Sequence, residues 1–217
     1  MNEKINKVLE NLKKNNMEAY YVDKKEDVLE LVKTLVPKGA TVAAGGSVTL
    51  NETGVMDYIK NGEFNYLDRN KPGLSKEEMN NVCIEALACD VYFSSSNAIT
   101  EDGDLYNVDG NANRVAALTY GPKSVVIVAG INKIVPDLTA AVIRLKTIAA
   151  PKNCLRLGIN NYCAIKGHCI SIDNGEGERL GAGCMSDTRI CCTTVISSKQ
   201  KFKNRIKVIL VGEELGY

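Results

Sequence analysis

The chain has 217 residues, of which 45% are hydrophobic and 24% are charged, with a formal net charge of +1. These values are ordinary for a globular protein and give no basic field that would recruit nucleic acid or an anionic membrane surface. No stretch approaches the ~18 consecutive apolar residues of a membrane span, and the first residues lack the apolar core of a signal peptide. The sequence therefore predicts a cytoplasmic protein without a membrane span or a nucleic-acid partner, and leaves the oligomeric state open.

Amphipathic helices and short apolar strands alternate from the start of the chain. Helical spacing of apolar residues predicts helices over residues 2–15 and 24–35, with a strand at 17–22 between them. Ser75-Lys76-Glu77-Glu78 is a capping box and predicts the start of another helix. The apolar face of that helix is expected to carry Met79, Val82, Cys83, Ala86 and Leu87.

Two apolar runs, residues 90–93 and 124–130, have the composition of buried strands. The second is continuous and β-branched, as in strands that are covered on both faces. A helix is expected from Pro136 to Pro151, and a last strand at 206–212. The alternation predicts an α/β fold with a mainly parallel sheet covered by helices on both faces.

The alternation breaks in residues 151–198, which hold six of the eight cysteines and few apolar runs. We interpret this stretch as a Cys-rich subregion inserted before the last strand of a single domain spanning residues 1–217. A reducing compartment disfavours a disulfide framework, so clustered thiols favour a metal or redox site. His168 is the one histidine of the chain, which excludes any mechanism that needs two.

Two polar segments each follow a predicted strand. Residues 94–114 follow the strand at 90–93, and Asp102-Gly103 within them predicts a hairpin turn. Gly45-Gly46-Ser47 follows a strand at 40–44 and precedes a helix, an arrangement that binds anions through backbone N–H groups and otherwise serves as an ordinary tight turn. Loops at the carboxyl ends of strands converge, so we expect both segments to line one crevice that binds a small anionic ligand.

The residues expected to bind this ligand are Gly45, Gly46, Ser47, Thr49, Asn97, Asn107, Asp109 and Arg114. Arg114 is the candidate clamp for a carboxylate or phosphate, because its planar fork holds two oxygens; an ion pair with a nearby Asp is the alternative. The catalytic residue is unknown. Candidates for a general base or nucleophile are Glu52, Glu101, Asp104 and Asp109, each of which could equally serve a turn or a helix cap.

Four motifs, at residues 45–50, 96–103, 107–114 and 128–135, together resemble the LUD-domain family of lactate utilisation proteins. The resemblance covers essentially the whole chain. It implies a NagB/RpiA/CoA-transferase-like fold and a role in organic-acid (lactate) metabolism, for some members within an iron–sulfur system. This chain shows no ferredoxin-like Cys-x-x-Cys-x-x-Cys spacing, so it is expected to need a redox partner protein to move electrons far. An isomerase- or CoA-transferase-like enzyme using a carboxylate and a non-catalytic, metal-containing scaffold or sensor are the alternatives, because a fold does not fix a reaction.

The same resemblance implies a metal centre at Cys163, Cys169, Cys184 and Cys191. Residues 163–169 are similar to the family's Cys-x-x-Thr-Gly-x-Cys motif, and residues 184–191 to its Cys-x-Ser-Pro-x-Arg-Ile-Cys motif. Asp187 replaces the proline, and residues 170–183 form a Gly-rich excursion where the family has two residues. Four thiolates suit a [4Fe–4S] cluster or, alternatively, zinc; reduced cysteines packed without metal are the third interpretation.

Overall fold

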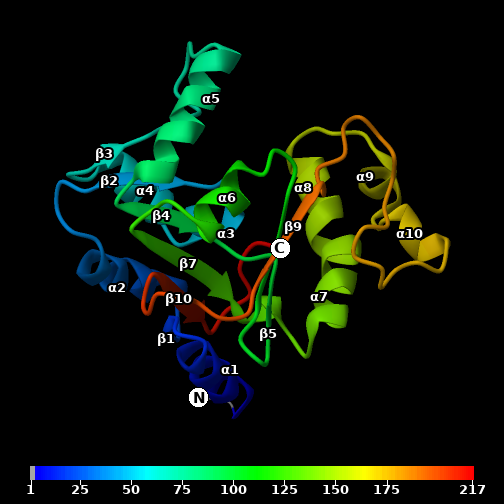
Figure 1. Ribbon diagram of the computed structural model, residues 1–217, viewed down its shortest axis with the longest axis horizontal. Helices are drawn as coiled ribbons and strands as arrows, with labels where there is room; N and C mark the ends of the chain where they lie inside the picture. The colour runs from blue at the N-terminus through cyan, green and yellow to red at the C-terminus, as the bar shows by residue number, and fades with distance from the viewer. Residues whose placement is uncertain (1–2) are drawn as a thin grey trace.

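The computed structural model describes residues 3–217 and is built on a six-stranded sheet with the strand order β1-β10-β7-β4-β2-β3 (Figure 1). The strands are β1 (Glu18–Val22), β2 (Thr41–Ala44), β3 (Asn65–Tyr66), β4 (Val91–Ser94), β7 (Ser124–Gly130) and β10 (Ile206–Val211). All neighbouring pairs run parallel. The predicted α/β fold with a parallel sheet is confirmed.

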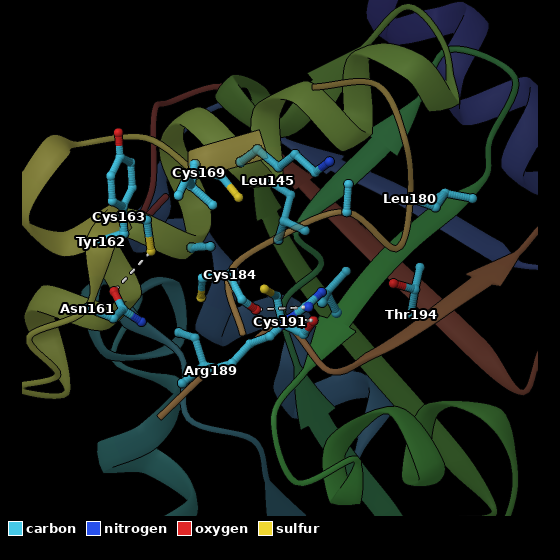
Figure 2. Close-up of a pocket in the computed structure, with 16 residues that line it drawn as sticks. Leu145, Asn161, Tyr162, Cys163, Cys169, Leu180, Cys184, Arg189, Cys191 and Thr194 are labelled. Carbon is cyan, nitrogen blue, oxygen red and sulfur yellow. Dashed lines mark hydrogen bonds between the residues drawn. The ribbon is translucent and has the colours of Figure 1, made fainter. Parts of the chain in front are cut away.

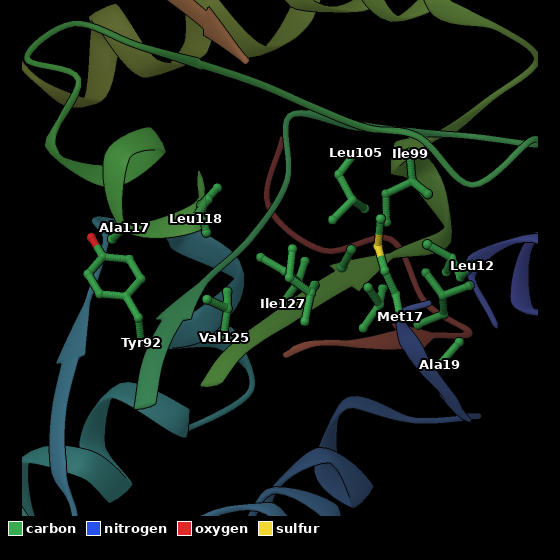
Figure 3. Close-up of a cluster of buried hydrophobic side chains, with 14 of the residues drawn as sticks. Leu12, Met17, Ala19, Tyr92, Ile99, Leu105, Ala117, Leu118, Val125 and Ile127 are labelled. Carbon is green, nitrogen blue, oxygen red and sulfur yellow. The ribbon is translucent and has the colours of Figure 1, made fainter. Parts of the chain in front are cut away.

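Helices cover both faces of this sheet. Successive side chains of each strand point to opposite faces, so both faces present apolar side chains for helices to pack against. In β7, Val125 and Ile127 belong to one apolar cluster, shown in Figure 3, and Val126 and Val128 to the other. The first cluster includes side chains of α1 (Glu3–Lys14) and α6 (Asn113–Thr119). The second includes those of α2 (Val28–Leu35), α3 (Val48–Glu52) and α4 (Val55–Asn61).

A second sheet of four strands has the order β8-β5-β6-β9. Strands β5 (Ala98–Thr100) and β6 (Leu105–Asp109) form the antiparallel hairpin predicted from Asp102-Gly103. Strand β8 (Ile134–Val135) runs parallel to β5, and β9 (Thr193–Ser197) pairs antiparallel with β6. Because β9 comes from the end of the Cys-rich subregion, that subregion contributes a strand to the fold, which the sequence did not indicate.

Helix α5 (Lys76–Glu85) begins at the predicted capping box, in which Ser75 Oγ accepts from the Glu78 N–H and the Glu78 carboxylate accepts from the Ser75 N–H. None of its residues is buried, and the helix projects from the body of the protein (Figure 1). The predicted apolar face holds only in its second half: Met79 is 38% exposed, Val82 and Cys83 are half-buried beside Tyr92, and full burial begins at Ala86 in the following 3-10 turn, Ala86–Ala88. Periodicity identifies residues that share a face but not whether another element packs against it.

One helical stretch continues past Pro151, where the sequence predicted an end. Helix α7 (Leu138–Arg144) leads through a π-helical turn (Leu145–Ala149) into α8 (Ala150–Arg156). In the π turn the Ala150 N–H donates to the Leu145 carbonyl, and Pro151 has no N–H to donate. The Lys146 carbonyl instead accepts the N–H of Cys169 at 2.8 Å. The π turn thus accommodates the proline and docks the Cys-rich subregion.

The Cys-rich subregion forms two short helices, α9 (Tyr162–Lys166) and α10 (Ile170–Asp173), followed by a long loop. Helices α7 and α8 lie between these elements and the six-stranded sheet (Figure 1). Within residues 3–217, no helix combines the length and the apolarity that crossing a bilayer requires.

The strand order also creates a crevice at the carboxyl edge of the six-stranded sheet. From β2 the chain moves outward to β3 and then returns to β4 on the other side of β2. The loops after β2 and β4 therefore leave the sheet toward opposite faces. Open α/β sheets bind ligands at such a switch point.

Candidate functional site

A cleft of about 500 Å³ opens at this switch point. Its lining includes residues 46–49 after β2, residues 94–97 after β4 and Lys133 after β7. Residues 187–190 of the Cys-rich subregion and Tyr217 complete the walls. The cleft thus lies where the carboxyl ends of three adjacent strands meet the Cys-rich subregion.

The structure brings the two predicted polar segments together at this cleft. The predicted ligand-binding residues that line it are Gly46, Ser47, Thr49, Asn97, Asp109 and Arg114. Gly45 and Asn107 lie behind the lining: the Gly45 N–H bonds the Phe93 carbonyl of β4, and Asn107 is buried. A Cβ at Gly45 would lie 2.8 Å from Arg114 Cδ, so this glycine gives Arg114 its space.

Arg114 lines the cleft, but its guanidinium bonds groups of the protein itself. Its two terminal nitrogens donate four hydrogen bonds of 2.7–3.3 Å, to the side chains of Asn97 and Asn107 and the carbonyls of Ser95 and Val108. Burial lowers the pKa of the guanidinium. These bonds join the loop after β4 to the hairpin, and they occupy the donors that a bidentate clamp would use.

Asp109 does not pair with the Arg114 guanidinium. Its Oδ2 accepts the backbone N–H groups of Arg114 at 2.9 Å and Val115 at 3.4 Å, at the start of α6, and its Oδ1 accepts the Gly110 N–H. The side-chain ion pair considered as an alternative for Arg114 is therefore replaced by bonds to backbone. Asp109 holds the start of α6 against the hairpin.

The other catalytic candidates lie outside the cleft lining. Glu52 accepts the Gly216 N–H at 2.7 Å, beside the C-terminal residues. Glu101 lies at the turn of the hairpin and pairs with Lys7 of α1 at 3.0 Å, a hydrogen bond that lowers the pKa of the carboxyl. Asp104, in the same turn, accepts a hydrogen bond from the Thr100 hydroxyl, with 2.9 Å between Thr100 Oγ1 and Asp104 Oδ2. Asp109 is thus the one predicted carboxylate in the cleft wall.

Lys133 lies in the cleft wall, although the sequence pattern did not single it out. Its side chain is 3% exposed, and Nζ donates to Ser95 Oγ at 2.8 Å and Thr49 Oγ1 at 3.0 Å. Burial, reinforced by the nearby charges of Arg144 and Arg114, lowers the pKa of the amine to about 7. Its position directly after the buried strand β7, at the same edge as the two polar segments, is the signal that could have identified it.

Positive charge dominates the cleft. Its lining holds the basic side chains Arg69, Arg114, Lys133, Arg156 and Arg189 and the acidic side chains Asp109 and Asp187. A Cβ at Gly46 would lie 3.5 Å from Arg69 Nη2 and 3.7 Å from Arg156 Nη2, so two guanidinium groups flank the glycine turn. A cleft lined by one sign of charge attracts the opposite sign, here an anion.

All four predicted metal ligands line a second, smaller pocket, of about 20 Å³ (Figure 2). Figure 2 shows the sulfur atoms of Cys163, Cys169, Cys184 and Cys191 around one space. No Asp, Glu or His is among the described residues of its lining, so the donor types suit a thiolate-ligated centre. As it stands, the pocket has room for about one water molecule. Over residues 3–217, no three His, Cys, Asp or Glu side chains are arranged to hold a metal ion.

The sequence profile of the LUD domain matches residues 5–211. The chain belongs to the LUD-domain family. No curated protein matches it. Its fold is similar to that of a DUF162-family protein from Deinococcus radiodurans, at 15% identity and a TM-score of 0.49 with 96% of each chain covered. A weaker likeness, at 18% identity and a TM-score of 0.35, is to eIF2B delta from Chaetomium thermophilum, over 52% of this chain and 48% of that one.

In this LUD domain the cleft and the cysteine pocket share part of their walls. Val108, Arg189 and Ile190 line both. Arg189 donates to the carbonyls of Cys191 at 3.0 Å and Cys184 at 3.2 Å, and so holds the loop that carries two of the cysteines. The guanidinium of Arg189 therefore lies between the cationic cleft and the thiols.

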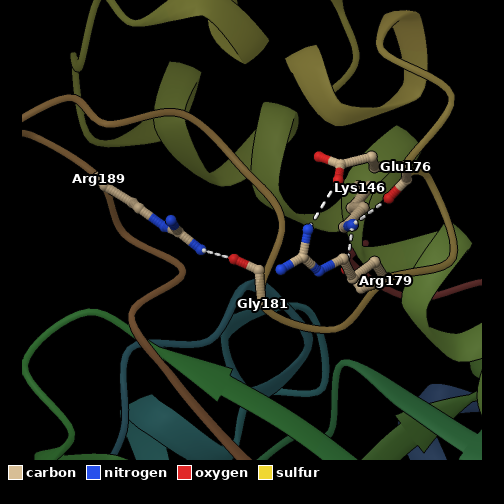
Figure 4. A network of polar contacts seen from close by, with 5 residues as sticks. All are labelled: Lys146, Glu176, Arg179, Gly181 and Arg189. Atoms are coloured by element: carbon tan, nitrogen blue, oxygen red, sulfur yellow. Dashed lines mark hydrogen bonds and ion pairs between the residues drawn. The ribbon is translucent and has the colours of Figure 1, made fainter.

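The rest of the Cys-rich loop is held in the same manner. Lys146 Nζ donates to the carbonyls of Arg179 at 2.6 Å and Glu176 at 3.2 Å, and Arg189 reaches Gly181 at 3.2 Å (Figure 4). The carbonyls of Glu176 and Arg179 also accept the N–H groups of Arg179 and Ala182 within turns, so Lys146 adds a second donor to each of them. The LUD domain thus fixes its cysteine loop by polar contacts rather than by a sheet.

Proposed function

We propose that this LUD-domain protein acts in organic-acid (lactate) metabolism, binding a small organic anion in the cleft beside an iron–sulfur cluster held by the four cysteines. The observation that carries the proposal is the shared wall: Arg189 and Ile190 line both the cationic cleft and the four-cysteine pocket. Oxidation of a hydroxy acid needs an anion site and an electron acceptor in close proximity. The arrangement of the two pockets suits that requirement.

Arg69 and Arg156 are the side chains best suited to bind the carboxylate. Their Nη2 atoms both lie near Gly46, whose lack of a side chain leaves the space between them open. A guanidinium holds a carboxylate through two parallel hydrogen bonds, which is stronger and more directional than a point charge. This role replaces the clamp first expected of Arg114, whose four terminal N–H groups all bond the protein. In Arg156, by contrast, only Nε and Nη2 bond Asn153 and Tyr217, which leaves Nη1 for a ligand.

The residues that would hold the cluster are Cys163, Cys169, Cys184 and Cys191, with zinc as the alternative occupant of the same donors. When bound, the cluster would accept electrons and pass them to a redox partner protein. Lys146 and Arg189 line the same pocket and place positive charge beside the thiols. Positive charge favours thiolates, the form in which cysteine binds a metal; at Cys191 burial is the larger effect and raises the pKa of the thiol, and the charge of Arg189 acts against it.

Metal analysis of anaerobically purified protein tests the cluster. We expect iron and sulfide in the wild type, and their loss in single Cys→Ser variants at positions 163, 169, 184 and 191. Cys83→Ser is the matched control, because Cys83 lies outside the pocket and should leave the metal content unchanged. The cluster is refuted if anaerobic wild type holds no iron, or if all four variants retain it; zinc without sulfide would identify the alternative occupant.

Calorimetry with lactate, pyruvate, a sugar phosphate and an acyl-CoA tests the anion site. We expect a small carboxylate to bind, and Arg69→Met and Arg156→Met each to weaken its affinity about tenfold or more, roughly 1.4 kcal/mol. Arg179→Met is the control, because Arg179 is exposed and lies outside the cleft. Binding of the sugar phosphate or the acyl-CoA with no binding of lactate or pyruvate would favour the isomerase- or transferase-like alternative instead.

A further inference from the structure

Lys133 is a buried amine that faces the cleft without a carboxylate partner. The acceptors of its Nζ are two neutral hydroxyls, those of Thr49 and Ser95. Among the described residues no Asp or Glu oxygen lies within ion-pair distance of it. A buried lysine that serves structure is normally paired, because an isolated buried charge is costly. An unpaired one that lines a cleft calls for a chemical explanation.

The charges around Lys133 favour the neutral amine. Arg114 of α6 and Arg144 of α7 both lower the pKa of the amine. Glu52 of α3 opposes them weakly. Both arginines are fixed in place: Arg144 donates to the carbonyls of Asn97 at 2.6 Å and Asn132 at 3.1 Å, and Arg114 makes the four bonds described above. Desolvation beside another cation is one of the ways in which proteins turn lysine into a nucleophile.

We propose that Lys133 is a nucleophile that forms an imine with the carbonyl carbon of a 2-oxo acid bound in the cleft. The proposal rests on the proposed function, because it uses the same anion site. The carboxylate of the 2-oxo acid binds the guanidinium groups beside Gly46, and its C2 carbonyl meets Nζ. The two substrate features thus match the two features of the cleft: cations for the carboxylate and an amine for the carbonyl.

The step is balanced without any further reactant. The Nζ lone pair attacks C2, and the carbonyl oxygen leaves as water with the two protons of the neutral amine. A C=N bond between Nζ and C2 replaces the C=O bond, and nothing is oxidised or reduced. The hydroxyls of Thr49 and Ser95, which hold Nζ in the resting protein, keep the amine at one position for the attack.

Reductive trapping tests the proposal on the full chain. We expect incubation with pyruvate and cyanoborohydride to add a single 1-carboxyethyl group to Lys133, found by mass analysis of peptides. Lys123 and Lys152 are internal references: both are exposed, and a hydrogen bond with Asp90 raises the pKa of Lys123 further. Near pH 7, Lys133 should be labelled at least about tenfold faster than either, because an ordinary lysine is then almost fully protonated.

Two variants and the pH profile complete the test. The labelling rate should rise between about pH 6 and 8, since the neutral amine gains population through a pKa of about 7. Lys133→Met should remain folded in a denaturant titration and lose the label, and Lys133→Arg, which keeps the charge without a nucleophilic amine, should lose it too.

The outcomes separate this inference from the function it rests on. If lactate binds in calorimetry but Lys133 is labelled no faster than Lys152, the imine is wrong and the anion site stands. Labelling of Lys133 without any binding of lactate supports the imine and refutes the lactate assignment. If neither acid binds and Lys133 stays unlabelled, both are wrong.

Discussion

The six-stranded sheet and the Cys-rich subregion are held together by different forces. In β7, six of seven residues are buried, and their side chains alternate between the two apolar clusters. In the Cys-rich subregion, Ile165 is 65% exposed and Met185 94% exposed, and Lys146 and Arg189 fix the loop by donating to its carbonyls. A region stabilised by a few polar contacts opens more readily than an apolar core. The LUD domain therefore places its thiols where the chain can adjust and its cleft where one wall is rigid.

The largest difference in stability between the two regions is expected from a cavity in the six-stranded sheet. Ile127→Ala removes a fully buried side chain of β7 and should lower the free energy of unfolding by about 2–5 kcal/mol. Ile165→Ala, in the Cys-rich subregion, should change it by less than about 0.5 kcal/mol. Denaturant titration of both variants measures the difference. Equal effects would show that the exposed surface of the subregion is buried in solution.

The free energy of unfolding should depend on pH because of Lys133, which lies in the cleft wall. Its pKa is about 7 in the folded protein and near the ordinary 10.5 when unfolded, so the unfolded chain binds more protons between these values. Stability should accordingly rise with pH by about 1.4 kcal/mol per unit from above pH 7 toward pH 10. Lys133→Met should remove this contribution. Parallel slopes for variant and wild type would mean that the amine is charged in the folded state.

A smaller effect, confined to the Cys-rich subregion, is expected from Lys146→Met. The variant removes the side-chain donor from the carbonyls of Glu176 and Arg179, which keep their turn bonds from the N–H groups of Arg179 and Ala182, so the cost should be about 1 kcal/mol. Amide hydrogen exchange should quicken in residues 169–191 and stay unchanged in β7. Lys152→Met, at an exposed position of α8, is the control and should alter neither. Faster exchange in β7 would contradict the separation of the two regions.

The smallest effect on stability is expected from Gly46→Val, in the glycine turn. Gly46→Val should leave unfolding nearly unchanged, because a Cβ there meets only ordinary contacts, but should weaken carboxylate binding by filling the space between Arg69 and Arg156. Gly45→Val should instead cost about 1–3 kcal/mol of stability, because its Cβ would press on Arg114. Calorimetry beside denaturant titration compares the two. Unchanged affinity in both variants would remove the turn from the anion site.

Local pattern was sufficient for much of the site. Gly46, Ser47 and Asn97 could be predicted because the loops after β2 and β4 both leave the carboxyl edge of the parallel sheet, whereas Asp109 reaches the cleft from the end of β6 in the second sheet. Arg114 was placed in the right region with a different role, since its hydrogen bonds depend on how the hairpin folds over α6. The spacing of a motif cannot tell an arginine that binds a ligand from one that binds the protein's own carbonyls.

The sequence by itself determined the elements with a local cause: the period of the strands, the capping box at Ser75 and the hairpin turn at Asp102-Gly103. The set of cysteines that line one pocket was expected from the resemblance to the LUD-domain family, not from a local cause. Tertiary structure alone decided the pairing of β9 with β6, the π turn before Pro151 and the burial of Lys133. The reason is physical. Periodicity and capping depend on neighbours within a few residues. A strand partner, a hydrogen bond to a distant carbonyl or a lowered pKa depends instead on groups that only packing brings together from distant parts of the chain.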